Sequence, residues 1–523
     1  MGAAWDAAAG EALSSATHHP YTPAPMPSYL DGRFVDVAAP DGELTVRSPA
    51  DLDDLVGVHP WSLAHVDDAV AAARRAAPAW DAAGLDARIT LVRKLRDAVA
   101  AHEDAVAHLI TREMGKVLRE GRAEAKAMVA KVDISIDEGL ALTRDVTLDG
   151  GRLAWRYRPH GVMAVIGPFN FPLHLAHGHI VPALLAGNTV VFKPSEVTPG
   201  CGELYARIVE GVGFPPGVVN VVQGAGAAGA RLATHPDVDG VLFTGSYGVG
   251  TEIIRANASR PGRMLALEMG GRNAAVVLDD APFDKAVADV LLSAFSTAGQ
   301  RCTCASRLIV AKGLAERFVA AVAERAARVK VGHPLDPGVF HGPLASPTAK
   351  ARFERFEAMA DAEGTACVFE PVEPAVSFEG RAVRGCYVAP RVRRVTNPSR
   401  ESAYQREEVF GPDLAVWVAD DDDHALALAN DTDFGLAAGV WTASEARFER
   451  FARGLRVGCV TWNAPTVGSS SRLPFGGLKN SGNHRPAGVF SSTYCAWPLA
   501  VTRGSSSYDP SSLPPGLGGA SKP

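Results

Sequence analysis

The chain has 523 residues, of which 47% are hydrophobic and 21% are charged, and its formal net charge is -6. At roughly 150 residues per domain, such a chain is too long for one core and is expected to form two or three domains. The composition is typical of a soluble globular α/β protein. Because acidic residues outnumber basic ones, we expect no basic face for nucleic acid, which excludes that class of partner.

No segment of the sequence indicates export or a membrane span. Residues 1–20 lack a basic region followed by an apolar one, and no run of 18 apolar residues occurs. The seven cysteines are scattered, at positions 201, 302, 304, 367, 386, 459 and 495. An odd and scattered set favours reduced thiols in a cytosol, so we expect a cytoplasmic protein with no membrane partner.

In chain order, both ends are predicted to be tails: 1–27 ends in alternating prolines and small residues, and 504–523 is of low complexity. Between 66 and 146, apolar residues recur at helical spacing, which predicts a layer of helices. From residue 153 the pattern changes to short apolar runs that alternate with helical stretches, and these predict βα units on a largely parallel sheet. The runs are 162–167, 189–192, 218–222, 240–243 and 274–278.

Ligands of such sheets bind outside the carboxyl ends of the strands, so the segments that follow the runs indicate the site. Three of these segments are polar or glycine-rich, as a nucleotide crevice requires: 168–172, 193–196 and 244–250.

Two glycine patterns compete for the pyrophosphate of a dinucleotide. Gly224 to Gly229 match G-x-G-x-x-G, but the acidic residue expected about 20 positions later is absent. Gly245 and Ser246 are preferred, because the amides and the dipole at a helix start suit a pyrophosphate. An ordinary capped turn is the alternative for that pair.

A cysteine loop lies at 296–304, after a helical pattern. Gly299 offers backbone freedom, and Arg301 offers positive potential that would stabilise the Cys302 thiolate. The loop therefore indicates a catalytic thiol, with a small buried hydrophobic residue as the alternative. Cys302 and Cys304 lack a second Cys or His pair at zinc spacing, so no metal site is expected.

Two further residue types point to the same chemistry. Glu268 lies on an apolar run that stops at two glycines, and burial there would raise its pKa until it could act as a general base. Asn170, between aromatic residues and prolines, offers a rigid amide that could donate to an oxyanion. For Glu268 the alternative is a solvated or salt-bridged carboxylate. Together with a dinucleotide crevice, these groups indicate acyl-enzyme chemistry coupled to hydride transfer.

At these residues the sequence resembles the aldehyde dehydrogenase superfamily, from about residue 28 to 503. The motifs occur in the family's order: PFNFP (168–172), FKPSE (192–196), FTGS (243–246), LEMGG (267–271), GQRCT (299–303), EEVFGP (407–412) and PFGG (474–477). The resemblance implies an α/β fold that assembles as a homodimer or homotetramer. Its parts would be a Rossmann-type NAD domain (28–146 and 166–270), an α/β catalytic domain (271–482) and an oligomerisation arm of β-strands (147–165 and 483–503).

The resemblance also implies a role for each matching residue. Cys302 would attack the aldehyde carbon, while the Asn170 amide and the Cys302 backbone N–H hold the oxyanion. Hydride would pass to NAD and leave a thioester, which water activated by Glu268 hydrolyses. The implied cofactor contacts are Lys193 and Glu196 at the adenosine ribose, Gly245, Ser246 and Gly250 near the pyrophosphate, and Glu408 and Phe410 at the nicotinamide. For Glu408, which follows Glu407, a surface charge is the alternative.

A narrower resemblance is carried by 178–196, 297–304, SGNHRP (481–486) and YCAWP (494–498), which are similar to the succinylglutamate semialdehyde dehydrogenases of arginine breakdown. It implies an aldehyde that bears carboxylates, with N-succinylglutamate 5-semialdehyde as the best match. Glutamate semialdehyde is the alternative substrate. A CoA-acylating enzyme, which would usually lack a base at the position of Glu268, and a non-catalytic protein are the alternative classes.

An anionic substrate needs cations near its far end, and Arg301, His484 and Arg485 are the candidates. The alternative is that the two arginines pair with acidic residues of the fold. Three nearby histidines are expected to pack near the substrate entrance rather than to form a metal cluster: His174, His177 and His179.

Overall fold

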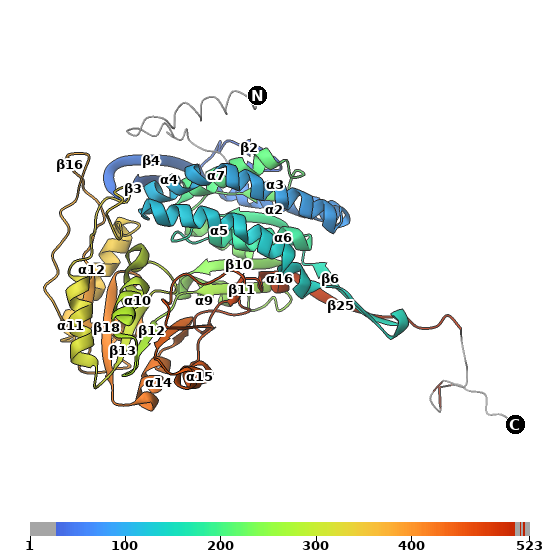
Figure 1. The fold of residues 1–523 in the computed structure, drawn as a ribbon. Coiled ribbons are helices and arrows are strands. Elements are labelled where there is room, and N and C mark those ends of the chain that lie inside the picture. Colours follow the sequence, from blue (N-terminus) through green and yellow to red (C-terminus); the bar gives the residue numbers. More distant parts are fainter. Residues whose placement is uncertain (1–27, 508–512, 514–515, 518–523) are drawn as a thin grey trace.

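The computed structural model describes residues 28–507, 513, 516 and 517, drawn as a ribbon in Figure 1. The predicted tail 1–27 and most of 504–523 lie outside the described residues. Within the described residues, no helix combines the length and the apolar character needed to cross a membrane.

The first sheet has seven strands in the order β11-β10-β7-β8-β9-β1-β2, parallel from β11 to β9, with β1 and β2 added antiparallel. Four of the five predicted apolar runs form its central strands, which are buried on both faces, as parallel strands usually are. The strands are β1 (Ser28–Leu30), β2 (Arg33–Val35), β7 (Val162–Ile166), β8 (Thr189–Lys193), β9 (Val219–Val221), β10 (Gly240–Gly245) and β11 (Met264–Met269).

Helices cover both faces of this sheet because side chains alternate along each strand. On β7, Met163 and Val165 pack into one core cluster with α3 to α7, whereas Val162 and Ala164 pack into another with α2 and α8. The predicted helical layer 66–146 supplies α2 to α5. The helices are α2 (Leu63–Ala82), α3 (Leu85–Ala101), α4 (Glu103–Met114), α5 (Leu118–Asp137), α6 (His174–Ala186), α7 (Pro199–Val212), α8 (Gly226–Thr234) and α9 (Tyr247–Asn257).

The second sheet has the order β14-β17-β18-β13-β12-β20-β21 and is parallel except for β14. The fifth predicted run, 274–278, forms β12 of this sheet and not a strand of the first. The strands are β12 (Asn273–Val277), β13 (Ala305–Ala311), β14 (Ala366–Cys367), β17 (Arg391–Arg394), β18 (Asp413–Ala419), β20 (Ala437–Trp441) and β21 (Cys459–Trp462). Its helices are α10 (Phe283–Phe295), α11 (Ala315–Ala326), α12 (Pro347–Ala362), α13 (Ala403–Arg406), α14 (Asp422–Asn430) and α15 (Glu445–Gly454).

A third sheet, of β5 (Val146–Leu148), β6 (Leu153–Pro159) and β25 (Ala496–Thr502), projects from the body in Figure 1. It carries exposed large apolar side chains, among them Trp155 and Trp497. The predicted arm extended to residue 165, but β7 begins at Val162 and lies inside the first sheet. The oligomerisation role of this arm stays a prediction.

The remaining elements are short connections and hairpins. They are β3 (Gly42–Ser48), β4 (Asp51–Trp61), β15 (Ser377–Phe378), β16 (Arg381–Ala382), β19 (Phe434–Gly435), β22 (Pro474–Phe475), β23 (Leu478–Lys479), β24 (Ala487–Gly488), α16 (Ser491–Tyr494), and the 3-10 turns η1 (Gly139–Thr143), η2 (Asp149–Gly151) and η3 (Ser296–Gly299). The chain passes from the first sheet to the second between β11 and β12, in only three residues. The candidate site lies at this crossing.

Candidate active site at the junction of the two sheets

The Cys302 loop joins η3 to β13 through an unusual backbone. Thr297, Ala298 and Gly299 all have positive φ, at 54°, 54° and 71°. A Cβ on Gly299 would clash with the carbonyl oxygen of Gly411, so only glycine fits there. The close turn brings the cysteine loop against the segment that precedes β18.

Asn273, at the start of β12, holds this loop in place. Its Nδ2 donates to the carbonyl oxygens of Cys302 at 2.7 Å and Cys304 at 2.9 Å, and its Oδ1 accepts from the Ala437 N–H at 2.9 Å. The side chain is 3% exposed. Asn273 was not among the residues singled out from the sequence, although it follows the LEMGG motif by only two positions.

Glu268 and Cys302 face each other across the crossing. Glu268 is 1% exposed, and its Oε1 has no hydrogen-bond partner among the described residues. Burial raises the pKa of Glu268 to about 8, and a hydrogen bond with the Cys302 side chain opposes that rise. The carboxyl is therefore largely protonated at neutral pH, as a buried and unpaired acid should be.

The electrostatics around Cys302 differ from the prediction. Burial raises the pKa of the Cys302 thiol well above its ordinary value, and the carboxylates of Glu268 and Glu408 raise it further. Arg301, whose positive potential was expected to stabilise the thiolate, forms an ion pair with Glu120 at 3.1 Å, and this carboxylate offsets part of its charge. The thiol is therefore protonated at neutral pH, and its side chain is hydrogen-bonded to Glu268.

Asn170 follows β7 and is 4% exposed. Its Nδ2 donates to the Gln300 carbonyl oxygen at 3.0 Å, and its Oδ1 accepts from the Phe171 N–H at 3.1 Å. The amide is therefore directed at the cysteine loop. Since an amide nitrogen carries two hydrogens, and one of them meets Gln300, the other remains to meet an oxygen beside the thiol.

Glu408 lies just after α13, and its carboxylate contacts the segment between β11 and β12. Its Oε1 accepts from the Gly271 N–H at 2.8 Å, and a Cβ on Gly270 would clash with its carboxylate. Burial raises the pKa of Glu408 to about 7, against the effect of that hydrogen bond. The alternative of an exposed surface charge fits Glu407, which is exposed, and not Glu408.

Phe410 lies two residues further on, in a left-handed conformation with φ of 56°. Its ring meets that of Phe169 edge to face, with centroids 5.8 Å apart. The two aromatic residues bring the turn before β18 against the segment after β7, next to Asn170.

The predicted nucleotide residues gather at the carboxyl edge of the first sheet. Lys193 ends β8, where its Nζ donates to the Gly224 carbonyl at 2.8 Å and contacts the exposed Glu196 at 3.3 Å. Burial lowers the pKa of Lys193, while Glu196 opposes that change. The segment from Gly224 to Gly229, which matches G-x-G-x-x-G, therefore also borders this crevice, because its Gly224 carbonyl accepts from Lys193.

At the next strand, Gly245 ends β10 and Ser246 is the N-cap of α9. The Ser246 hydroxyl accepts from the Val249 N–H at 3.4 Å, and Gly250 is buried in the first turn of the helix. The capped turn named as the alternative is present. It leaves the helix N-terminus, with its orphan amides, at the edge where a pyrophosphate would bind.

The three candidate cations for an anionic substrate have different surroundings. Arg301 is paired with Glu120, and its Nε donates to the Thr297 hydroxyl at 2.8 Å. Arg485 is half-buried and donates to the Gly477 carbonyl at 2.8 Å, with no carboxylate within ion-pair distance among the described residues. His484 is exposed. The alternative of pairing within the fold therefore holds for Arg301 and not for Arg485.

A second unpredicted group surrounds Phe171. Lys116 and Glu124 form a fully buried ion pair at 2.7 Å, and the Lys116 ammonium lies 3.6 Å from the centroid of the Phe171 ring. The other Glu124 oxygen accepts from the N–H groups of Leu173 and His174, at the start of α6. The contacts from Glu124 to these N–H groups span 49 and 50 residues of sequence, so no local pattern could have indicated them.

The three histidines of α6 contact aromatic side chains. His177 contacts the Tyr205 hydroxyl at 3.0 Å and His179 the Tyr494 hydroxyl at 2.7 Å, while His174 lies beside the Phe171 ring. Burial lowers the pKa of His174 to about 4 and of His177 and His179 to about 3. In the part of the chain that the structure describes, His, Cys, Asp and Glu side chains form no group of three that could hold a metal ion.

Comparison with known proteins gives concordant matches. A model of the aldehyde dehydrogenase family matches residues 35–496. The N-succinylglutamate 5-semialdehyde dehydrogenase of Burkholderia thailandensis is 42% identical over 495 residues, which cover 94% of this chain and 99% of that protein.

Two solved structures are similar over almost the whole chain. HpcC from Thermus thermophilus is 32% identical with a TM-score of 0.86, over 93% of this chain and 95% of that chain. A mutant of aldehyde dehydrogenase C from Pseudomonas syringae, in complex with NAD+ and octanal, is 31% identical with a TM-score of 0.85, over 92% of this chain and 97% of that chain. These matches confirm the predicted α/β fold class.

Proposed function

The chain belongs to the aldehyde dehydrogenase family, as its motifs predict, and on this premise we propose that it oxidises an aldehyde bearing carboxylates with NAD as the acceptor. The observation that carries the proposal is the contact between a thiol, Cys302, and a buried carboxyl, Glu268, whose raised pKa suits a general base. The proposed reaction forms and then hydrolyses a thioester at Cys302.

In the first step, the Cys302 sulfur forms a bond to the aldehyde carbon, and the thiol proton passes to the Glu268 carboxylate. The aldehyde oxygen becomes an oxyanion, which the second N–H of the Asn170 amide and the Cys302 backbone N–H stabilise. Asn273 holds the Cys302 and Cys304 carbonyls and thereby keeps the cysteine loop in place. When bound, NAD supplies the acceptor for the hydride that leaves the substrate carbon.

Before the second step, Glu268 releases the thiol proton to solvent. It then removes a proton from water, and the water oxygen attacks the thioester carbon. The bond between carbon and sulfur breaks, the carboxylic acid leaves, and Cys302 recovers a proton. Both steps use the carboxylate form of Glu268, whose share grows as the pH rises towards its raised pKa of about 8.

The residues at the sheet edge fit NAD. The helices α8 and α9 begin just after β9 and β10, so their N-terminal amides lie on one edge and would hold the pyrophosphate, with Ser246 at the cap of α9. Lys193 and the exposed Glu196 would contact the adenosine ribose, and Glu408 with Phe410 the nicotinamide end. Glu196 would repel a 2′-phosphate, which favours NAD over NADP.

The substrate is proposed to be N-succinylglutamate 5-semialdehyde, converted to N-succinylglutamate as in arginine breakdown. The name of the relative at 42% identity supports it, and so does Arg485, a half-buried guanidinium that has no carboxylate partner among the described residues. Because Arg301 is paired with Glu120, we do not assign it to the substrate carboxylates. Arg485 and the exposed His484 form the proposed anion site.

Steady-state kinetics with the succinylated semialdehyde, glutamate semialdehyde and propanal test this proposal. We expect the succinylated substrate to have the highest kcat/KM, and Arg485→Ala to raise its KM far more than that of propanal. Equal kcat/KM for propanal and the succinylated substrate would contradict the substrate, and highest activity with glutamate semialdehyde would favour that alternative. No NADH formation with any of the three would contradict the proposal as a whole.

Two further parts of the proposal concern assembly and location. The projecting arm, with its exposed Trp155 and Trp497, is proposed to join copies of this chain into a dimer or tetramer. All seven cysteines are free thiols, as a reducing cytoplasm would keep them.

A further inference from the structure

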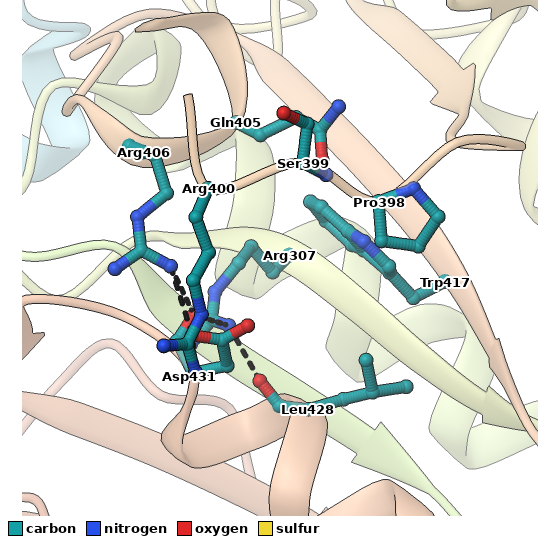
Figure 2. A pocket seen from close by; sticks show the side chains of 9 residues that line it. All are labelled: Arg307, Pro398, Ser399, Arg400, Gln405, Arg406, Trp417, Leu428 and Asp431. Carbon is teal, nitrogen blue, oxygen red and sulfur yellow. Dashed lines mark hydrogen bonds and ion pairs between the residues drawn. The ribbon is translucent and has the colours of Figure 1, made fainter. Parts of the chain in front are cut away.

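A cavity of about 230 Å³ lies on the second sheet, between the segment before α13 and the end of α14. In Figure 2 the side chains of Arg307, Arg400 and Arg406 gather around Asp431, while Trp417 and Pro398 line the other side. None of these residues belongs to the catalytic or cofactor contacts proposed above. The cavity is therefore a separate feature, with a cationic end and an apolar wall.

The three arginines of the cavity have fewer carboxylate partners than they have positive charges. Arg400 and Arg406 contact the same oxygen, Oδ1 of Asp431, at 3.1 Å and 3.0 Å. Arg406 has a second partner in Asp433 at 3.0 Å. Three guanidinium groups thus meet two carboxylates, and positive charge is in excess at this end of the cavity.

Arg307 contributes most to the excess because it has no carboxylate within ion-pair distance among the described residues. Its guanidinium donates to the carbonyl oxygens of Leu428 and Ala429, each at 2.8 Å, at the C-terminal end of α14. Carbonyls at a helix end carry only partial negative charge. They satisfy the hydrogen-bonding capacity of Arg307 but do not neutralise it.

Burial makes the excess of positive charge in the cavity destabilising. Arg307 is 4% exposed and the side chain of Arg406 17%, so water screens their mutual repulsion poorly. Burial lowers the pKa of Arg307 to about 9, and the charges of Arg272 and Arg406 lower it further, while the charge of Asp431 opposes this effect in part. An anion in the cavity would reverse this effect.

We propose that this cavity binds a small divalent oxyanion, either a phosphate group or a pair of carboxylates, at a site distinct from the aldehyde and cofactor sites. Arg400 and Arg406 contact the anion, and the buried charge of Arg307 adds to the potential behind them. Guanidinium groups suit this ligand because their planar fork can donate two hydrogen bonds to one oxyanion. Arg400, with 80% of its side chain exposed, lies at the mouth and can reorient onto an entering anion.

Calorimetric titration of the NAD-saturated protein with inorganic phosphate, and separately with succinate, tests the proposal at constant ionic strength. Saturation with NAD keeps phosphate from the pyrophosphate position. We expect saturable binding of an anion that Arg400→Ala weakens about tenfold and that Arg485→Ala leaves unchanged. Asp431→Asn should tighten binding, because it removes the carboxylate that competes for the same two arginines.

Arg328→Ala is the matched control, since that side chain is 76% exposed and pairs with Glu324 away from the cavity. Its anion affinity should equal that of the wild type. Binding of phosphate alone or of succinate alone would support the site and identify the class of anion. No saturable binding of either probe would overturn the proposal, as would equal weakening by Arg328→Ala and Arg400→Ala, or weaker binding by Asp431→Asn. Because the readout is binding, it is independent of aldehyde oxidation.

Discussion

The buried carboxyl of Glu268 should make the stability of the protein depend on pH in a defined direction. Its pKa is raised from 4.5 to about 8 in the folded state. Between these values the folded state binds more protons than the unfolded state, so the contribution of this group to stability falls as pH rises. At about 1.4 kcal/mol per pH unit, the loss reaches roughly 5 kcal/mol once the pH exceeds the folded pKa.

Glu268→Gln removes the ionisation while keeping the size of the side chain. The variant and the wild type should melt at similar temperatures near pH 5, and the variant should melt several degrees higher near pH 9. Acids that do not interact with Glu268 affect both proteins alike, so the difference between the two melting curves reports Glu268 together with its interaction with Glu408. Glu407→Gln is the control, because the exposed Glu407 lies next in sequence to Glu408 and should give no such pH-dependent gain.

The same ionisation should govern turnover. With a pKa of about 8, roughly a tenth of Glu268 is ionised at pH 7 and roughly nine tenths at pH 9, so a kcat limited by thioester hydrolysis should rise about tenfold. Glu268→Gln should slow steady turnover and, because Glu268 also accepts the thiol proton, should slow the first formation of NADH, followed by its fluorescence in a stopped-flow instrument. Melting curves that run parallel at all pH values, or a kcat of the variant equal to that of the wild type, would refute the reasoning.

Three further predictions concern single contacts. Cys302→Ala should bind NAD in a fluorescence titration but form no NADH, whereas Cys304→Ala should keep most activity; turnover by the first variant would reject Cys302 as the nucleophile. Asn273→Ala removes three buried hydrogen bonds and should lower kcat more than tenfold and destabilise the protein by about 3 kcal/mol or more in thermal melting, and an unchanged kcat would exclude its positioning role. NADP should give a much lower kcat/KM than NAD, and Glu196→Ser should narrow that gap; equal kcat/KM for the two cofactors in the wild type would contradict the role of Glu196.

Local sequence patterns predicted four of the seven strands of the first sheet, and the family. Apolar runs bounded by polar or glycine-rich segments are a short-range property, and the strands β7, β8, β9 and β10 were therefore found. The same pattern could not tell which sheet a strand joins: the run 274–278 forms β12 of the second sheet. Sheet membership depends on pairing between distant strands, which apolar periodicity does not encode.

The surroundings of Cys302 could not be predicted in the same way. Arg301 could be recognised as a charge beside the nucleophile, but its partner Glu120 lies on α5, far away in sequence. An ion pair formed by tertiary packing offsets a charge that looks free in the sequence, although the Arg301 charge still lowers the pKa of Cys304 in the same loop. Asn273 could not be predicted for a related reason. An asparagine near a glycine pair is common in turns. Only the folded chain shows that its amide donates to two carbonyls of the cysteine loop.

Charge pairing beside Phe171 restricts how an anionic substrate can be recognised. Lys116 and Arg301 both lie over this ring, at 3.6 Å and 5.4 Å from its centroid, and each has its own carboxylate, Glu124 and Glu120. The four charges cancel, so this group offers an anion little net attraction. A carboxylated aldehyde must gain its preference elsewhere, and Arg485 is the half-buried candidate without a carboxylate partner among the described residues. Specificity for the anion should therefore respond to Arg485, while Arg301 and Glu120 should act together through the shape of the cysteine loop.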